Sequence, residues 1–208
     1  MPKYKNPFLI ELKARSILET LSWKDFLKKI ENVTDDSHKA LLITQYLVGA
    51  RPAEICFLIK ERIEIEKHHI KMKIRTIKGG FERLIMLPIC NEQTKFLADF
   101  FKKKIFPKEY LFTHIAKYRN PRDKFLRLNI EYNIGETVKG KFYPYTFYFF
   151  RHNIASILFD LGLEEKYINF YFGKPLLPKA IAGSSTFYVH GSRKYALEVA
   201  KYLKKVMN

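Results

Sequence analysis

The stretch Tyr145-Thr-Phe-Tyr-Phe-Phe-Arg-His-Asn-Ile-Ala-Ser156 is the most informative part of this 208-residue chain. Its apolar residues recur at the spacing of one helix face, and the pattern continues to Leu161. Gly162 follows, as glycine often does after the last helical residue. The sequence therefore predicts an amphipathic helix over residues 146–161 that carries Arg151 among aromatic side chains.

Three further helices are predicted upstream. Ser22 is a suitable cap for a helix through residue 30, and Asp35 or Asp36 for a second that ends at Gly49. Pro52 suits the first position of the next helix. Arg51 is therefore expected in a short, rigid corner between two helices.

Between residues 62 and 88 the period changes from helical to alternating. Ile70, Met72 and Ile74 alternate with cations, and an apolar run follows Gly79-Gly80. This pattern predicts a β-hairpin with Lys78 at its turn. Helices are expected over residues 91–104, 124–128, 164–172 and 192–206, and a loop over residues 129–144. The predicted fold is α+β, mainly α-helical with a small antiparallel β-sheet.

The composition indicates a polyanionic partner. There are 38 Lys and Arg residues against 21 Asp and Glu, which gives a formal net charge of +17. Such an excess favours a nucleic acid, although an anionic membrane surface or a ribosomal site is also compatible with it. We expect no membrane association and a cytoplasmic location, because the sequence shows neither an apolar run of about 18 residues nor a secretory signal. Cys56 and Cys90 form no pair with metal-ligand spacing, so no metal is expected.

Five motifs, in this order, resemble those of the catalytic domain of the tyrosine recombinase (phage-type integrase) family. They are Gly49-Ala-Arg-Pro-Ala-Glu-Ile, Lys78-Gly-Gly-Phe-Glu-Arg, the stretch beginning at Tyr145, Phe172-Gly-Lys, and Ser185-Thr-Phe-Tyr-Val-His. The resemblance implies that Arg51 and Arg151 are catalytic arginines, with Glu54 as a supporting acid. It also implies that Lys78 is the hairpin lysine and that Tyr188 is the nucleophile.

The chain departs from the family pattern at two histidine positions. Tyr148 stands where the family has the first box histidine, and Lys174 replaces a later one. The interval from Lys174 to Tyr188 is also longer than usual. These features are most similar to integrases of archaeal spindle-shaped viruses and related elements.

The resemblance implies an enzyme that cleaves and rejoins DNA through a 3′-phosphotyrosine. Paired guanidiniums suit the charge that develops on the nonbridging oxygens of a phosphodiester. Lys78 is the candidate general acid, and Tyr148 and Lys174 are expected to donate to phosphate oxygens. No cofactor is expected.

Other polar residues are weaker candidates. His152 is expected to support the site, and Lys71, Lys73, Arg75, Arg83, Lys102 and Lys103 are expected to bind DNA. Several of the candidate residues, catalytic ones included, also have a plainer interpretation. A turn lysine such as Lys78 is often merely solvated, an arginine among aromatics such as Arg151 often stacks on them, and residues 102–104 fit an exposed helix end equally well.

We expect residues 1–208 to form a single catalytic domain. Residues 1–21 are expected to be a helical extension, and residues 186–208 the nucleophile segment and C-terminal helix. Only about 20 residues precede Ser22, so we expect no core-binding domain before the catalytic domain. The chain is then expected to be either a trimmed form of a longer protein or a natural short form. Self-association on DNA as a dimer or tetramer is expected. Two alternatives remain: a non-catalytic DNA-binding remnant or regulator, and a type IB topoisomerase-like nicking and closing enzyme.

Overall fold

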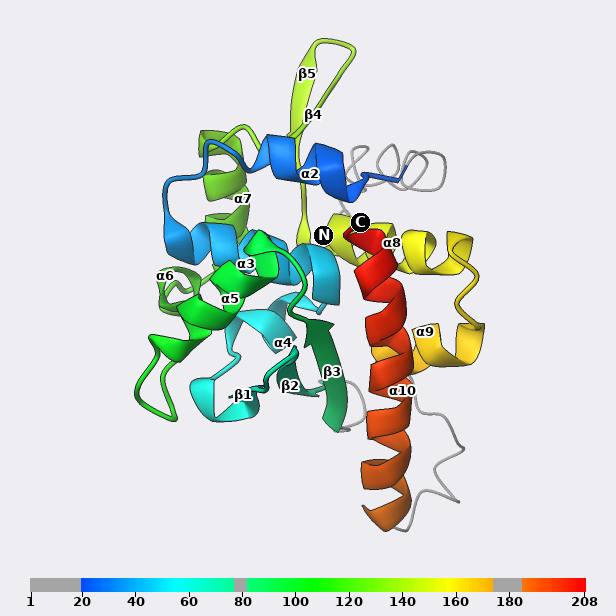
Figure 1. Ribbon diagram of the computed structural model, residues 1–208. Coiled ribbons are helices and arrows are strands. Elements are labelled where there is room, and N and C mark those ends of the chain that lie inside the picture. The colour runs from blue at the N-terminus through cyan, green and yellow to red at the C-terminus, as the bar shows by residue number, and fades with distance from the viewer. Residues whose placement is uncertain (1–19, 77–81, 174–184) are drawn as a thin grey trace, which may run out of the picture.

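A computed structural model describes residues 20–76, 82–173 and 185–208, and helices predominate in it (Figure 1). None of the helices in these ranges is long and apolar enough to cross a membrane. In chain order they are α2 (Trp23–Lys29), α3 (Asp36–Val48), α4 (Pro52–Cys56), α5 (Glu92–Lys102), α6 (Thr113–Ala116), α7 (Pro121–Glu131), α8 (Phe147–Asp160), α9 (Glu165–Tyr171) and α10 (Ser185–Val206).

A three-stranded antiparallel sheet follows the short 3₁₀ turn η1 (Lys60–Arg62). Its strands β1 (Ile63–Ile65), β2 (His69–Arg75) and β3 (Glu82–Pro88) lie in chain order. Ile70, Met72 and Ile74 are buried, which confirms the predicted alternation. In the β2–β3 register Ile74 is opposite Arg83. The sequence thus places Arg83 on the buried face of the sheet.

Residues 129–144 were predicted to form a loop, and this prediction is wrong. They contain the end of α7 and a second hairpin, β4 (Gly135–Val138) with β5 (Lys141–Pro144), which projects from the body in Figure 1. Lys139 and Gly140 form its two-residue turn with φ values of 49° and 76°, a conformation that glycine tolerates well. Such short strands give too few alternating residues for a pattern to be recognised.

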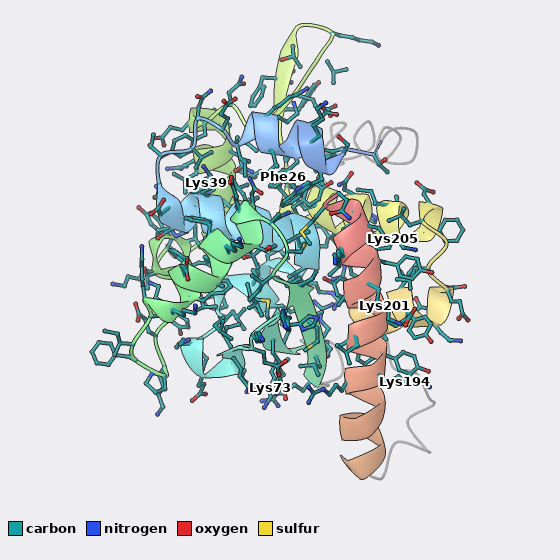
Figure 2. The ribbon with its side chains drawn as sticks, in the orientation of Figure 1. Phe26, Lys39, Lys73, Lys194, Lys201 and Lys205 are labelled. Atoms are coloured by element: carbon teal, nitrogen blue, oxygen red, sulfur yellow. The ribbon has the colours of Figure 1, made fainter. Side chains whose placement is uncertain are left out.

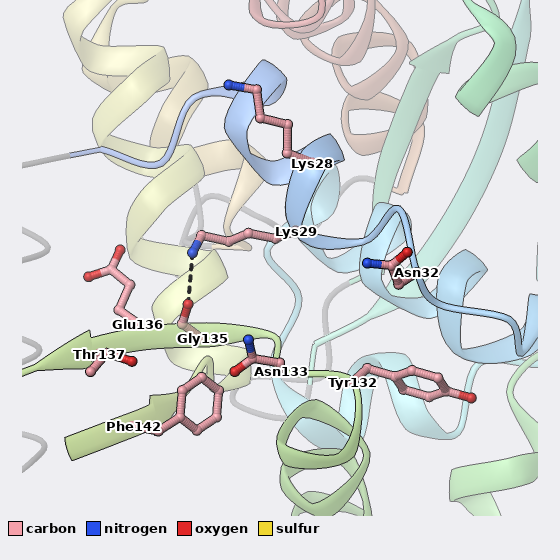
Figure 3. A pocket seen from close by; sticks show the side chains of 9 residues that line it. All are labelled: Lys28, Lys29, Asn32, Tyr132, Asn133, Gly135, Glu136, Thr137 and Phe142. Atoms are coloured by element: carbon pink, nitrogen blue, oxygen red, sulfur yellow. Dashed lines mark hydrogen bonds between the residues drawn. The ribbon is translucent and has the colours of Figure 1, made fainter. Parts of the chain in front are cut away.

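Lys29 anchors the base of this second hairpin to α2. Its Nζ donates to the carbonyl oxygen of Gly135 at 2.8 Å, at a polar pocket between the two elements (Figure 3). The same ammonium lies 5.5 Å from the centroid of the Tyr145 ring. Lys29 therefore has an internal structural role in spite of its charge.

The core is organised around α3 and α8, which pack against each other. Aromatic side chains link the surrounding elements to this pair: the rings of Phe26 and Tyr46 stack 4.3 Å apart, and those of Phe125 and Phe147 stack 3.9 Å apart. Phe26 lies inside the molecule while Lys73 and Lys201 project outward (Figure 2). Because α3 and α8 are in contact, the C-terminal end of α3 lies beside Arg151 on α8.

The last helix begins earlier than predicted. α10 starts at Ser185 rather than near residue 192, and its buried Ala196, Ala200 and Leu203 lie on the side that packs along β3 and α9. A single internal glycine such as Gly191 costs a helix only about 1 kcal/mol relative to alanine, so it does not end α10. The backbone of Tyr188 therefore belongs to this helix, and not to a segment before it.

Candidate active site

Arg51 lies at the corner between α3 and α4, as the sequence predicts. Gly49 ends α3 in the left-handed conformation (φ 55°), and Pro52 begins α4. Arg51 caps the new helix through Glu54: its backbone N–H donates to Glu54 Oε2 at 3.0 Å, and its Nη1 donates to Oε1 at 2.9 Å. The Arg51 side chain stays 25% exposed, whereas that of Glu54 is fully buried.

Arg83 is the second cation on Glu54. Its Nη2 donates to Glu54 Oε2 at 3.0 Å, and its Nη1 donates to the carbonyl oxygen of Tyr171 at the end of α9. The side chain is only 2% exposed. The prediction that Arg83 binds DNA directly is therefore wrong, because its guanidinium is enclosed by protein. Its position had a signal in the sequence, since Arg83 is in phase with the buried Ile85 and Leu87.

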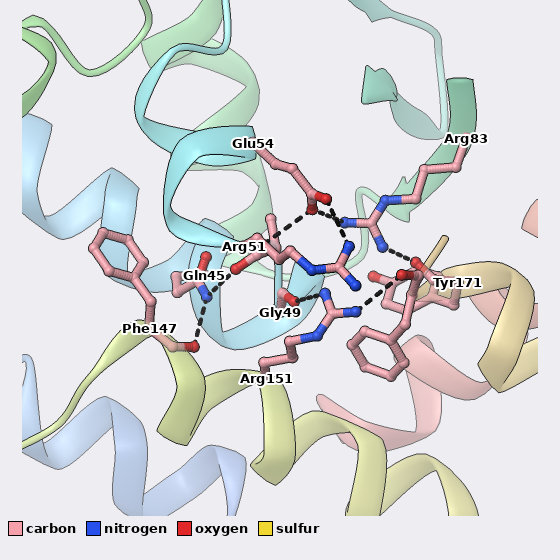
Figure 4. Close-up of polar contacts among 10 residues, drawn as sticks. Gln45, Gly49, Arg51, Glu54, Arg83, Phe147, Arg151 and Tyr171 are labelled. Atoms are coloured by element: carbon pink, nitrogen blue, oxygen red, sulfur yellow. Dashed lines mark hydrogen bonds and ion pairs between the residues drawn. The ribbon is translucent and has the colours of Figure 1, made fainter. Parts of the chain in front are cut away.

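Arg151 projects from α8 toward the same corner (Figure 4). Its Nη1 donates to the carbonyl oxygen of Gly49 at 2.8 Å, and its Nη2 donates to that of Phe172 at 2.9 Å. Its guanidinium also lies 4.5 Å from the centroid of the Phe172 ring. The structure thus brings Arg51, Glu54 and Arg151 together with Arg83. We call these four residues the arginine cluster.

Two glycines allow the close packing around the cluster. A Cβ at Gly49 would lie 2.8 Å from Ile154 Cγ2 and 3.0 Å from the Cα of Arg151, so only glycine lets α3 end against α8 here. Gly173 has a φ of 71°, and a Cβ there would lie 2.3 Å from Thr76 Cγ2. Glycine is therefore required at positions 49 and 173, next to the two carbonyl groups that Arg151 contacts.

Three guanidiniums and one carboxylate leave an excess of positive charge in the cluster. Burial is the largest cause that lowers the pKa of Arg151, and repulsion from Arg83 and Arg51 acts in the same direction, so that the pKa is about 10. Burial also lowers the pKa of Arg83, and the charge of Glu54 opposes that shift. Arg151 remains protonated at neutral pH. The cluster is thus suited to an anionic ligand whose charge offsets this repulsion.

The other predicted catalytic residues fall into two groups. Tyr148 and His152 are exposed on α8, near Arg151 in sequence. Lys78 and Lys174 lie outside the described residues, and for Tyr188 only the backbone in α10 is described. The roles of these residues therefore stay predictions.

The remaining predicted DNA-binding cations lie on two elements. Lys71 is on β2 and pairs with Glu64 at 2.7 Å, while Lys73 and Arg75 are exposed on the same strand. Lys102 is exposed at the end of α5, where it pairs with Asp99 at 3.3 Å, and Lys103 follows it. None of these five cations has a described bond to the arginine cluster, and their contact with DNA stays a prediction.

Sequence reasoning missed two sets of residues. Gln45 bridges the corner to α8, since its Nε2 donates to the carbonyl oxygens of Ala50 and Phe147 at 2.9 and 3.0 Å (Figure 4). Exposed arginines around α7 were also missed, and one of them lies over the ring of Tyr148 at 5.9 Å from the centroid. These arginines are Arg119, Arg122 and Arg127. The sequence predicted a short helix over residues 124–128 but gave no hint that α7 lies beside α8.

Known structures share this fold. The chain is similar to the XerA recombinase, with a TM-score of 0.54 and 17% identity over 86% of this chain and 61% of that one. It is also similar to the XerH site-specific recombinase bound to its difH substrate in a pre-cleavage complex, with a TM-score of 0.52 and 16% identity over 88% of this chain and 55% of that one. The fold is therefore that of a tyrosine recombinase catalytic domain.

Sequence comparison identifies the family directly. The chain belongs to the Phage integrase family, which matches residues 18–173. A curated relative is the tyrosine recombinase XerA of Pyrococcus horikoshii, 27% identical over 209 aligned residues that cover 99% of this chain and 68% of the relative. The chain thus spans 55% to 68% of the length of the recombinases that it resembles.

Proposed function

We propose that this protein is a site-specific DNA recombinase or integrase that cleaves and rejoins DNA through a 3′-phosphotyrosine intermediate. The observation that carries the proposal is the pairing of Arg51 and Arg151 at one partly exposed corner of a phage integrase family fold. Both guanidiniums are held by bonds to the protein, so they are oriented before substrate binds. Preorganised donors of this kind stabilise developing charge without reorganising during the reaction.

The two arginines are proposed to hold the nonbridging oxygens of the scissile phosphate. Arg51 uses only Nη1 on Glu54, and Arg151 uses one N–H on each of two carbonyls, so each guanidinium keeps further N–H donors. A planar fork matches phosphate geometry, and its charge persists at any working pH. These contacts strengthen as the phosphorus becomes five-coordinate, which is the condition for catalysis.

Tyr188 is the proposed nucleophile. The phenol releases its proton to solvent, and its oxygen attacks phosphorus and forms a P–O bond to the 3′ side of the DNA while the bond to the 5′ oxygen breaks. The 5′ oxygen leaves as a hydroxyl after taking a proton, for which Lys78 is the proposed donor. In the reverse direction a 5′ hydroxyl attacks the phosphotyrosine and releases the tyrosine. Tyr148 and Lys174 are proposed to donate to phosphate oxygens, with His152 in support.

The proposed partner is double-stranded DNA, and the proposed location is the cytoplasm. The formal charge of +17 supports the first of these, because cations that neutralise phosphates release counterions. The XerH site-specific recombinase, which shares this fold, is bound to its difH substrate. Self-association on DNA as a dimer or tetramer is part of the proposal, since strand exchange needs two cleaved sites.

A nicked duplex that traps the covalent intermediate tests the proposal. Cleavage close to the nick releases a short strand that carries the new 5′ hydroxyl and diffuses away. Without this hydroxyl the phosphotyrosine bond cannot be attacked in the reverse direction, so the adduct accumulates. We expect a protein–DNA adduct stable in denaturant, and no adduct with Arg151→Ala. Adduct formation should persist in a chelator.

The other outcomes separate the alternatives. Binding without any adduct would identify a non-catalytic DNA-binding protein. An adduct combined with relaxation of supercoiled DNA, but without exchange between two sites, would identify a topoisomerase-like enzyme. A strict Mg²⁺ requirement would point to a nuclease.

A further inference from the structure

Arg83 is the only fully buried lysine or arginine in the described part of the chain. It comes from the start of β3, and its contacts lead to two different supports of the active site. One is the carboxylate of Glu54, which also holds Arg51. The other is the carbonyl oxygen of Tyr171, which directly precedes the carbonyl oxygen of Phe172 that holds Arg151. Arg83 therefore binds the carboxylate that holds Arg51, and it binds the carbonyl next to the one that holds Arg151 (Figure 4).

Stability alone does not explain a buried ion pair at this position. Replacing such a pair by apolar side chains is often neutral or stabilising, because both charges must be removed from water. Glu54 is fully buried, and without Arg83 its charge would be balanced by Arg51 alone. Arg51 would then be drawn further onto the carboxylate. With Arg83 present, Arg51 contributes one side-chain bond and stays 25% exposed.

The contact with Tyr171 fixes the second support. The last carbonyls of a helix carry partial negative charge, and here two successive ones at the end of α9 are bound by two arginines. Tyr171 is held from its other end as well, since its hydroxyl donates to the carbonyl oxygen of Leu47 at 2.7 Å. Arg83 thus joins β3, α4 and α9 at one point.

From these contacts we infer that Arg83 is a positioning residue for DNA cleavage. It sets the distance between the Arg51 and Arg151 guanidiniums without touching DNA. The inference rests on the proposed function. It predicts that loss of Arg83 weakens the contacts of Arg51 and Arg151 with the charged scissile phosphate in the transition state. Binding of the rest of the duplex should stay unchanged.

The test compares two nicked substrates under single turnover with saturating protein. One has an ordinary phosphodiester at the cleavage site, and the other has a methylphosphonate, which lacks the charge that the arginines contact. For Arg83→Met we expect cleavage of the phosphodiester to slow by roughly tenfold to a hundredfold, the range expected when a reacting group is misplaced by about 1 Å. On the methylphosphonate the variant should lose much less. DNA affinity should change by no more than about twofold, in line with phosphate contacts distributed over the whole interface.

Arg62→Met is the matched control. It removes an arginine that pairs with Glu82, the neighbour of Arg83, on the exposed side of the sheet. We expect it to cleave both substrates at the wild-type rate. Urea unfolding of both variants then separates a change in stability from a change in cleavage.

Several outcomes would overturn the inference. One is cleavage of the phosphodiester by Arg83→Met at the wild-type rate. Another is an equal loss of cleavage rate on both substrates, because an equal loss would mean that Arg83 has a purely structural role. If Arg83→Met does not fold, Arg83→Lys takes its place, since it keeps the charge but not the fork. Slow phosphodiester cleavage by Arg83→Lys with normal affinity supports the inference, and a wild-type rate overturns it. If the wild type itself forms no adduct, the proposed function is wrong and the inference falls with it.

Discussion

The guanidinium of Arg151 is held by Phe172 in two ways, through the ring 4.5 Å from its centroid and through the carbonyl oxygen at 2.9 Å. Arg151 stacks on an aromatic side chain, as the plainer interpretation of the sequence expects, and it also lies beside Arg51. The two interpretations are therefore compatible, because the stacked ring is part of what orients the guanidinium.

This relationship predicts the effect of Phe172→Leu. The change keeps the carbonyl contact and removes the ring, whose interaction with a partly desolvated arginine contributes about 1–2 kcal/mol. We expect single-turnover cleavage to slow by roughly fivefold to thirtyfold, since about 1.4 kcal/mol corresponds to a factor of ten. Phe170→Leu is the control, because Phe170 is equally buried on α9 but packs on Tyr195. Equal rates for the two variants would contradict the prediction.

Substitution of the arginines themselves should abolish cleavage. Arg151→Ala and Arg51→Ala each remove a fork that contacts the transition state, so adduct formation should fall by about a thousandfold, the scale of losing a preorganised charge-stabilising donor. Most of the DNA affinity should remain. Arg151→Lys should restore little, because one ammonium cannot reach both the Gly49 and Phe172 carbonyls and also present a planar fork. Adduct formation by either alanine variant at the wild-type rate would show that the motif assignment is wrong.

Local sequence signals predicted the position of Arg51 well. Gly49, Arg51 and Pro52 combine a helix stop, an extended residue and a helix start, and each of these depends only on its own backbone. The long helix carrying Arg151 has enough turns for its period to be read. These elements are specified locally, so the sequence alone was sufficient.

Arg83 and the second hairpin show where sequence reasoning fails. The partners of Arg83 are 29 and 88 positions away, so its burial depends on contacts that no local pattern contains. Charge made it resemble a surface residue, whereas its phase on β3 indicated the inside. In the second hairpin, four-residue strands are too short to show a period, and tertiary contacts such as Lys29 with Gly135 stabilise them.

The nucleophile assignment is tested by mapping the trapped adduct. Tyr188→Phe removes only the hydroxyl, so it should eliminate the adduct with little loss of stability or DNA affinity. Tyr195→Phe is the control. The ring of Tyr195 packs 4.8 Å from that of Tyr167 and 5.4 Å from that of Phe170, which fits a packing role on α10. Peptide mapping that finds phosphate on Tyr195, Tyr167 or Tyr171 would contradict the assignment.

The exposed arginines around α7 should contribute to the salt dependence of DNA binding. If about six to ten phosphates are contacted, affinity should fall by about 10³ to 10⁵ between 50 and 200 mM salt. Arg119→Ala and Arg127→Ala should each lower the slope of log K against log salt by about 0.9, the value for one phosphate contact. Lys201→Ala on α10 is the control, since Lys201 is exposed but paired with Glu198 at 2.7 Å. An unchanged slope for both arginine variants would place the DNA elsewhere.

Two neighbouring histidines in the core should make stability depend on pH. His38 is fully buried, its Nε2 lies 3.0 Å from Asn129 Oδ1, and its ring centroid is 5.7 Å from that of His114. Burial lowers the pKa of both histidines to about 4. The folded state therefore disfavours the proton more than the unfolded state does, where the pKa is about 6.5. Their contribution to stability is complete above pH 6.5 and is lost as the pH falls toward 4.

Urea unfolding at pH 7 and pH 5 measures this loss. Each histidine should lower the free energy of unfolding by up to about 2 kcal/mol at pH 5, because the unfolded chain takes up the proton and the folded chain does not. His114→Phe removes one titrating group and fits the aromatic surroundings of Phe112 and His38, so the difference between the two pH values should shrink by about that amount. His68→Gln, at an exposed position, should leave the difference unchanged. The same pH dependence in His114→Phe and wild type would show that this histidine is not kept neutral by the fold.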